Sequence, residues 1–148
     1  MSKRLGFCSA VTAFSTVAFL LLGADTAGVN YVESEKVTAA LANGGSLVRT
    51  PEFTVSGSHR DKGGQVEVHE KETDILYVVE GEATFVTGGT MVGGKTTQPG
   101  QLIGTDIQGG QTHRLRKGDV ITIPAGTPHW FKEVPKSVNY FVVKVLKP

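Results

Sequence analysis

Short runs of alternating apolar and polar residues, separated by turn-forming residues, follow one another from residue 47 to the end of the chain. Such alternation is typical of β-strands with one buried face. A helical period appears before these runs, in residues 31–45, where Val37, Ala40 and Leu41 lie on one face. The pattern predicts one short helix followed by eight strands, over residues 53–59, 65–69, 75–79, 83–87, 111–116, 120–123, 129–133 and 138–146.

The distribution of glycine favours an antiparallel all-β fold. Of the 19 glycines, 14 lie between Gly57 and Gly126, among β-branched runs, as expected for short strands joined by tight turns. Residues 88–110 form one long glycine-rich segment, which we interpret as a loop or a loose hairpin. Eight strands behind one helix predict a sandwich or barrel. Because both alternating sets in residues 75–79 are apolar, we expect that strand to be covered on both faces, with Tyr77 in the core.

The size and charge of the chain limit the classes of function. A length of 148 residues suits one domain with a sizeable core. The formal net charge is +1, with acidic and basic residues interspersed, so nothing indicates a nucleic-acid partner. The sequence has no serine-nucleophile elbow, no P-loop and no dinucleotide-binding glycine motif. A small-molecule ligand or substrate is the expected partner.

The first 27 residues differ from the rest of the chain. A short basic segment precedes an uncharged, mostly apolar stretch over residues 5–24, and this order predicts an export signal to the periplasm or the exterior. The alternative is an uncleaved membrane anchor, against which several hydroxyl residues in the stretch argue. The single cysteine, Cys8, lies in this segment. The expected organisation is a signal peptide over 1–27, a short helix and linker over 28–46, and a barrel domain over 47–148.

Two acidic residues and a histidine lie close together in the stretch from Gly63 to Gly81. On the strand predicted for residues 65–69, Val66 and Val68 occupy one face while Glu67 and His69 occupy the other. If the valines face the core, the polar residues form a solvated surface. If the polar residues face the inside of a barrel, they must be paired or coordinate an ion. The pattern of this strand leaves both interpretations open.

A second motif, GDVITIPAGTPHWFKE, spans residues 118–133 and contains a strand, a Pro-Gly turn and a second strand that begins near His129. Together the two stretches resemble the cupin family, whose motifs run G-x5-H-x-H-x3,4-E-x6-G and G-x5-P-x-G-x2-H-x3-N. The positions of the second motif that agree are Gly118, Pro124, Gly126 and His129, while Glu133 stands where Asn is usual.

The first motif agrees at fewer positions. His69 matches the second histidine, Asp74 stands at the acidic position, and Gly81 follows at the closing glycine. Glu67 replaces the first histidine, and Asp61 holds the place of the leading glycine. The resemblance extends over about residues 53 to 144, and it implies a small single-domain, conserved-barrel cupin of the type-2-like kind, with an antiparallel jelly-roll β-barrel.

The resemblance also implies one divalent metal, held by Glu67, His69, Asp74 and His129. Two imidazoles and two carboxylates form a nitrogen and oxygen set that suits Fe, Mn, Ni or Zn as the dication. An alternative set keeps His69, Asp74 and His129 as ligands and makes Glu67 a catalytic general base or a partner that orients a ligand. A degenerate or metal-free pocket is the other alternative.

Other residues receive weaker assignments. His59, His113 and Phe131 are candidates to line the pocket, with a hydrogen-bonded core position as the alternative for the two histidines. Tyr140 is expected in the core. Glu72 is expected to be solvated, because strand parity or a turn directs it away from His69.

The resemblance implies two functions of different class. In the first, the chain is a small exported metalloenzyme (an oxygenase, isomerase, lyase or decarboxylase) that acts on a small polar or carboxylated molecule. In the second, it is a binding protein that holds a small ligand in the barrel without turnover. Such domains often pair through their N-terminal strands, so a homodimer is also expected.

Overall fold

The computed structural model describes residues 28–147. The export signal predicted for residues 1–27 lies outside this range. No helix within the range is long and apolar enough to cross a membrane. Its elements in chain order are α1 (Ser34–Asn43), β1 (Gly45–Arg49), β2 (Phe53–Arg60), β3 (Val66–His69), β4 (Glu72–Thr87), β5 (Thr90–Val92), β6 (Lys95–Gln98), β7 (Gln101–Gly104), β8 (Asp106–Gln108), β9 (Gln111–Arg116), β10 (Val120–Ile123), β11 (His129–Glu133) and β12 (Val138–Leu146).

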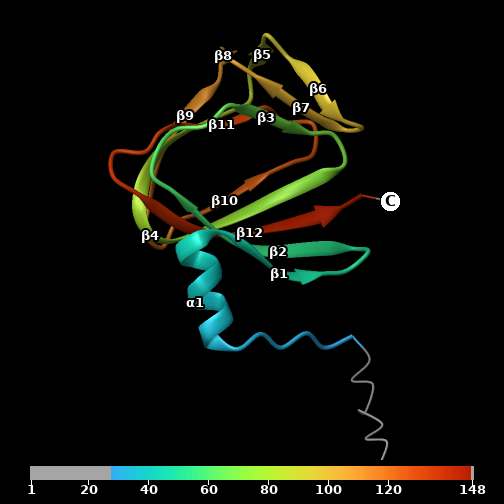
Figure 1. Ribbon diagram of the computed structural model, residues 1–148. Helices are drawn as coiled ribbons and strands as arrows, with labels where there is room; N and C mark the ends of the chain where they lie inside the picture. The colour runs from blue at the N-terminus through green and yellow to red at the C-terminus, as the bar shows by residue number, and fades with distance from the viewer. Residues whose placement is uncertain (1–27, 148) are drawn as a thin grey trace, which may run out of the picture.

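The strands form two facing sheets that share β4 (Figure 1). The first sheet contains β1, β2, β12, β10 and the first part of β4. The second contains β6, β7, β3, β11, β9 and the last part of β4. Every one of these pairings is antiparallel, and the two sheets enclose a barrel-like interior. The predicted jelly-roll fold is therefore confirmed.

A single glycine explains why β4 belongs to both sheets. The pattern predicted two strands separated by a turn at Gly81, whereas the structure has one continuous strand of 16 residues. Gly81 has φ +83°, and a side chain there would collide with the carbonyl oxygen of Ser137. Only glycine adopts this backbone conformation without strain and leaves room for the neighbouring chain. The strand therefore bends at Gly81 and continues into the second sheet.

The core fills the space between the two sheets. Its fully buried side chains include Val78, Phe85 and Val138, and Tyr140 is only 6% exposed, as predicted. The prediction that residues 75–79, now part of β4, are covered on both faces was wrong. Tyr77 is 45% exposed, because it lies on the outer face of the first sheet opposite Val120 of β10, which is itself 62% exposed.

The helix is where the sequence predicted it, and it packs against β2. Ala40 is its buried residue. A Cβ at Gly57 of β2 would lie 2.7 Å from the backbone carbonyl carbon of Ala40, so the close approach of helix and sheet depends on glycine at this position.

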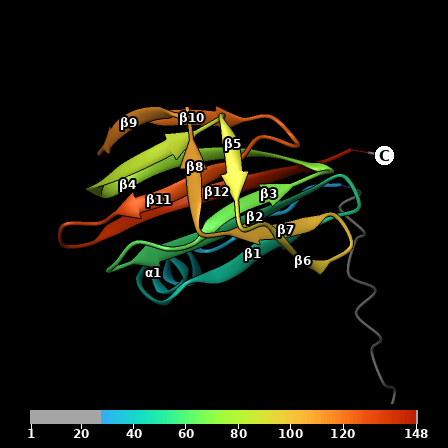
Figure 2. The same cartoon turned by 90° about the horizontal axis from the view of Figure 1, so that it is seen from above.

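The glycine-rich segment 88–110 is more regular than the loop or loose hairpin that the sequence predicted. It contains four short strands, β5 to β8. The strands β5 and β8 pair with each other and run across the direction of β3 and β11 (Figure 2). In the other pair, β7 adds to the edge of β3 and places Gln101 opposite His69. The segment 88–110 therefore supplies, through Gln101, one wall of the region around His69.

Candidate metal-binding site

The candidate ligands come from three strands that face the barrel interior. Glu67 and His69 lie two residues apart on β3, and His129 at the start of β11 pairs directly with Glu67. Asp74 lies on β4 in the first sheet. His69, Asp74 and His129 are buried, at 8%, 4% and 7% exposure. The polar face of β3 is therefore directed inward, and the interpretation of this face as solvated was wrong.

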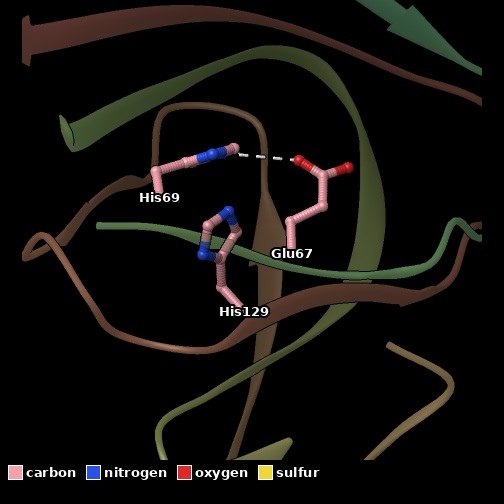
Figure 3. Close-up of side chains that lie close together, drawn as sticks. All are labelled: Glu67, His69 and His129. Carbon is pink, nitrogen blue, oxygen red and sulfur yellow. Dashed lines mark ion pairs between the residues drawn. The ribbon is translucent and has the colours of Figure 1, made fainter. Parts of the chain in front are cut away.

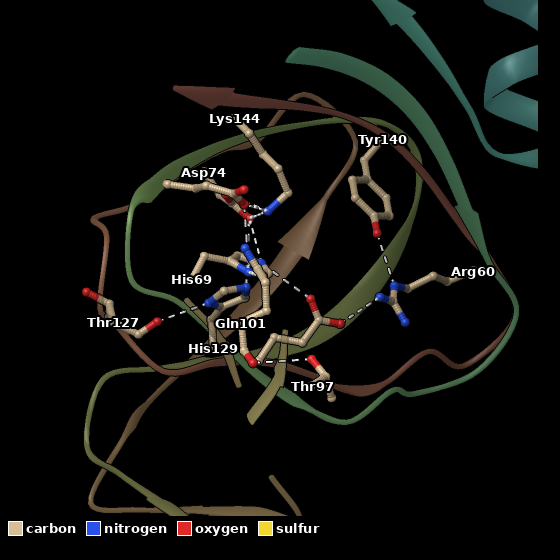
Figure 4. Close-up of polar contacts among 11 residues, drawn as sticks. Arg60, His69, Asp74, Thr97, Gln101, Thr127, His129, Tyr140 and Lys144 are labelled. Carbon is tan, nitrogen blue, oxygen red and sulfur yellow. Dashed lines mark hydrogen bonds and ion pairs between the residues drawn. The ribbon is translucent and has the colours of Figure 1, made fainter. Parts of the chain in front are cut away.

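The four predicted ligands lie within a few ångströms of one another (Figures 3 and 4). His69 Nε2 is 3.5 Å from Glu67 Oε2 and 3.5 Å from Asp74 Oδ2. His129 Nε2 is 3.8 Å from the same oxygen of Asp74. The imidazole rings of the two histidines are 5.0 Å apart. His69 Nε2 therefore lies between the two carboxylates, and Asp74 lies between the two histidines.

The opposite nitrogen of each imidazole is held by an oxygen atom. His129 Nδ1 is 3.0 Å from the backbone oxygen of Thr127, and His69 Nδ1 bonds to Oε1 of Gln101. An Nδ1–H group that donates to oxygen fixes the tautomer in which Nε2 carries a lone pair. Both histidines are thus oriented to offer Nε2 to a cation at the centre of the cluster.

The spacing of these atoms fits a divalent ion. Four ligands in a tetrahedron about an ion, with bonds near 2.1 Å, lie about 3.4 Å from one another. The separations of 3.5, 3.5 and 3.8 Å are close to this value. Two groups of three residues have ligand atoms that all lie within 4.8 Å of one another: one is Glu67, His69 and His129, and the other is His69, Glu72 and Asp74. The donor set of imidazole and carboxylate is one that first-row dications bind.

Burial and charge give the two histidines different pKa values. The hydrogen bond from His69 is the main reason why the pKa of Glu67 is lowered. Burial acts to lower the pKa of His69, but the hydrogen bond to Glu67 and the charge of Asp74 outweigh it, so that this pKa is raised. Burial lowers the pKa of His129. Without an ion, His69 therefore takes up a second proton more readily than His129 does.

A lysine that the sequence analysis missed completes the cluster. Lys144 Nζ is 3.0 Å from both oxygens of Asp74 (Figure 4), and it is 3.0 Å from Glu72 Oε2. The expectation that Glu72 is solvated was wrong, since its side chain is only 21% exposed in this ion pair. Strand periodicity could have indicated that Lys144 faces inward, because it lies four residues after the inward-facing Tyr140 on β12 and therefore shares its face.

The ion pair between Lys144 and Glu72 predicts a loss of stability in acid. Burial raises the pKa of Glu72, but the hydrogen bond and charge of Lys144 outweigh it and bring the pKa below its ordinary value of 4.5. A depressed carboxyl pKa stabilises the fold above the unfolded pKa, and this stabilisation is lost as the pH falls through the folded pKa. We expect the free energy of unfolding of chelator-treated protein to decline below about pH 4.5, and Lys144→Met to flatten this decline. Urea unfolding of both proteins across this pH range measures the free energy of unfolding. An equal slope of this free energy against pH in the two proteins would contradict the prediction.

A cavity of about 80 Å³ opens beside the cluster. Its polar lining includes Arg60, Glu67 and Lys144, and its apolar lining includes Phe131 and Leu76. The position predicted for Phe131 agrees with this lining.

The two weaker histidine candidates lie outside this cavity. His59 is exposed on β2, where its Nδ1 is 2.6 Å from Asn139 Oδ1 on β12. The adjacent Arg60 takes the inward-facing position instead. His113 on β9 is 2.8 Å from Thr87 Oγ1, through Nε2. Assignment of either histidine to the pocket lining was therefore wrong. Each is hydrogen-bonded, as the alternative expected, but His59 is exposed and does not occupy the core position that the alternative also implied.

The fold and the cluster together define a small antiparallel barrel with histidine and carboxylate groups that are able to bind a divalent cation. The sequence profile of the Cupin family matches residues 52–148, which is more than half of the chain. The chain therefore belongs to the cupin family. Among curated proteins, none matches this sequence.

Several solved structures are similar to this chain. BH2720 from Bacillus halodurans is 16% identical, with a TM-score of 0.58 over 84% of this chain and 86% of that one. Hydroquinone 1,2-dioxygenase from Sphingomonas sp. TTNP3 is 12% identical, with a TM-score of 0.57 over 76% and 73%. The Cnp3 cupin domain of Schizosaccharomyces pombe is 15% identical, with a TM-score of 0.51 over 70% and 59%. At these identities the similarity shows the fold alone.

Proposed function

We propose that this cupin binds one divalent metal through Glu67, His69, Asp74 and His129. We further propose that it acts as a metalloenzyme, of the oxygenase, isomerase, lyase or decarboxylase kind, on a small polar or carboxylated molecule. The observation that carries the proposal is that His69 Nε2 lies 3.5 Å from both Glu67 and Asp74, with His129 Nε2 3.8 Å from the same oxygen of Asp74. The bound ion would be Fe, Mn, Ni or Zn and would polarise an oxygen atom of the substrate.

The protein's own residues would supply the remaining functions. Glu67 has one carboxylate oxygen near His69 and the other 3.5 Å from Arg60 Nη2, so it lies between the cluster and the cavity. As the alternative general base, it would accept a proton from a substrate held there. The side chains of Leu76, Phe131 and Val142 line the cavity and limit the entry of water.

The test is the metal content of the protein purified without a histidine tag. We expect about one equivalent of a divalent ion by elemental analysis, and a lower melting temperature after chelation. Turnover of a small carboxylated substrate should stop in the chelated protein and return when the ion is restored. A purified protein that gains no Zn²⁺ in solution would contradict the proposal.

Gln101 offers a more specific test of how the site is built. Its Oε1 holds His69 Nδ1, and removal of such an orienting partner typically lowers metal affinity by about 10- to 100-fold. We expect Gln101→Leu to weaken Zn²⁺ binding by this factor in a calorimetric titration. Gln98→Leu is the matched control, because Gln98 lies on β6 of the same hairpin with its side chain exposed. Equal affinity in the two variants would show that the contact does not orient the histidine.

A second candidate function is supported by Lys144. Its ammonium group contacts both oxygens of Asp74 and so already supplies a positive charge beside the cluster. A metal-free cupin that binds a small ligand without turnover is compatible with this arrangement. Ligand binding that is unchanged by chelation would favour this alternative, whereas metal-dependent consumption of a ligand would exclude it.

The proposal also includes export and pairing of chains. The basic segment and apolar stretch of residues 1–27 support export to the periplasm or the exterior, with a membrane anchor as the alternative. The homodimer is supported by the resemblance to other cupins. The N-terminal residue of the secreted protein, and its mass in solution, test these two points.

A further inference from the structure

The cavity beside the cluster contains one arginine whose environment indicates the class of ligand. Arg60 Nε donates a hydrogen bond to Tyr140 Oη at 3.0 Å. The guanidinium carbon lies 4.8 Å from the centre of the Phe131 ring. Stacking on an aromatic ring and a bond at Nε fix the plane of the guanidinium before any ligand binds. Figure 4 shows Arg60 beside Tyr140, and Glu67 has one oxygen 3.5 Å from Arg60 and the other 3.5 Å from His69.

The guanidinium retains donors for a ligand. It carries five N–H groups, of which the bond to Tyr140 uses one. Its contact with Glu67, from Nη2 to Oε1, is 3.5 Å and is longer than an ordinary hydrogen bond. Two terminal nitrogens in a fixed plane match the two oxygens of a carboxylate. Lys144 is unsuited to this role, because its ammonium group is already bound at 3.0 Å by Asp74 and Glu72.

The charges around the cavity also favour an anion once an ion is bound. If Glu72 is included, which pairs with Lys144 but does not line the cavity, the carboxylates of Glu67, Asp74 and Glu72 outnumber the cations Arg60 and Lys144 by one. A dication changes this excess of one negative charge into an excess of one positive charge. A ligand with a single negative charge then neutralises the site. This neutralisation is favourable because attraction between opposite charges is stronger where little solvent screens it.

The size and lining of the cavity limit the ligand further. A volume of about 80 Å³ holds roughly six water-sized groups, at 10–15 Å³ for each. The carboxylate of Glu67 spans the distance between Arg60 and His69. A ligand whose carboxylate binds Arg60 can therefore place a second oxygen atom, two or three bonds from that carboxylate, beside the cluster. Leu76 and Val142 provide an apolar wall for a short carbon segment.

We propose that Arg60 anchors the carboxylate of a small hydroxy or oxo acid whose second oxygen faces the histidine and carboxylate cluster. This inference rests on the proposed function and names the substrate class of the same site. Arg60 determines which ligand binds, while Glu67, His69, Asp74 and His129 hold the ion. Loss of Arg60 should therefore remove selectivity for the carboxylate, while all four proposed ligands to the ion are still present.

The test compares lactate with lactamide, its neutral analogue of similar size, by calorimetric titration into the Zn²⁺-loaded full chain. We expect lactate to bind and lactamide to bind at least tenfold more weakly, and Arg60→Met to weaken lactate by about 10- to 100-fold, as expected for bonds to a charged group. Arg60→Lys keeps the charge but loses the planar pair of donors, so it should recover only part of the affinity. Arg114→Met is the matched control, since Arg114 also pairs with a glutamate, Glu82, but on the surface of β9.

The outcomes separate this inference from the proposed function. Failure of Zn²⁺ to bind the wild-type chain contradicts the proposed function; lactate is then titrated into the metal-free chain, where binding that Arg60→Met removes supports the inference and no binding overturns it. Bound Zn²⁺ with equal affinity for lactate and lactamide overturns the inference alone. Unchanged lactate affinity in Arg60→Met also overturns it. If Arg60→Met does not fold, Arg60→Lys and the comparison of the two ligands in the wild-type chain decide the matter.

Discussion

Replacement of His129 by alanine should weaken Zn²⁺ binding by about 100-fold or more, since loss of a ligand should exceed the 10- to 100-fold cost of losing an orienting partner. His69→Ala should have an effect at least as large. The Nε2 atoms of these histidines are held toward the cluster by Thr127 and Gln101, and His69 Nε2 contacts both carboxylates at 3.5 Å. Each substitution removes a nitrogen ligand and leaves the two carboxylates with only one imidazole beside them. The measurement is a calorimetric titration of chelator-treated protein.

The matched control for both substitutions is His113→Ala. His113 is also a hydrogen-bonded histidine of the second sheet, with Thr87 as its partner, but it lies outside the cavity. We expect the His113→Ala variant to bind Zn²⁺ with the same affinity as the wild-type protein. If all three alanine variants bind equally, the site proposed here is not where the ion binds.

Phe85→Ala should destabilise the fold by about 3–5 kcal/mol, as large-to-small changes of buried aromatic residues do. Phe85 is 0% exposed and lies on the part of β4 that belongs to the second sheet. Its ring packs edge-to-face against Phe131 at 4.7 Å and lies 6.1 Å from the ring of His129. The cavity left by the substitution would therefore lie between the core and the metal-binding cluster.

Urea unfolding at neutral pH measures this change, with Tyr77→Ala as the control. Tyr77 is an aromatic residue of the same strand but is 45% exposed, so its loss should cost much less. The Phe85 variant should also bind Zn²⁺ more weakly, because His129 loses a neighbour that restricts its ring. Equal loss of stability in the two variants would contradict the assignment of Phe85 to the core.

The sequence predicted the features that depend on residues close together in the chain. The alternation of apolar residues located the strands, and the spacing of Glu67 and His69 on one strand face placed both toward the same volume. The motif that contains His129 added a third predicted metal ligand. Gly81 was recognised as a turn, but whether a glycine ends a strand or bends it depends on the chain that packs against it, here Ser137.

The features that the sequence did not predict depend on pairing between distant strands. Lys144 reaches Asp74 because β12 pairs with β4 in a register that places the two residues opposite each other. Gln101 reaches His69 because β7 adds to the edge of β3. Arg60 was overlooked in favour of His59, one residue earlier, because the face of β2 that points inward is set by its pairing with β12.

The proposed activity requires that two imidazoles and two carboxylates, brought together from separate strands, share a single cation. Diffraction from crystals soaked in Zn²⁺, collected on both sides of the zinc absorption edge, tests this directly. We expect one strong anomalous peak within about 2.0–2.3 Å of Nε2 of His69 and of His129, and of a carboxylate oxygen of Glu67 or Asp74. A fully soaked crystal with no peak among these atoms would contradict it.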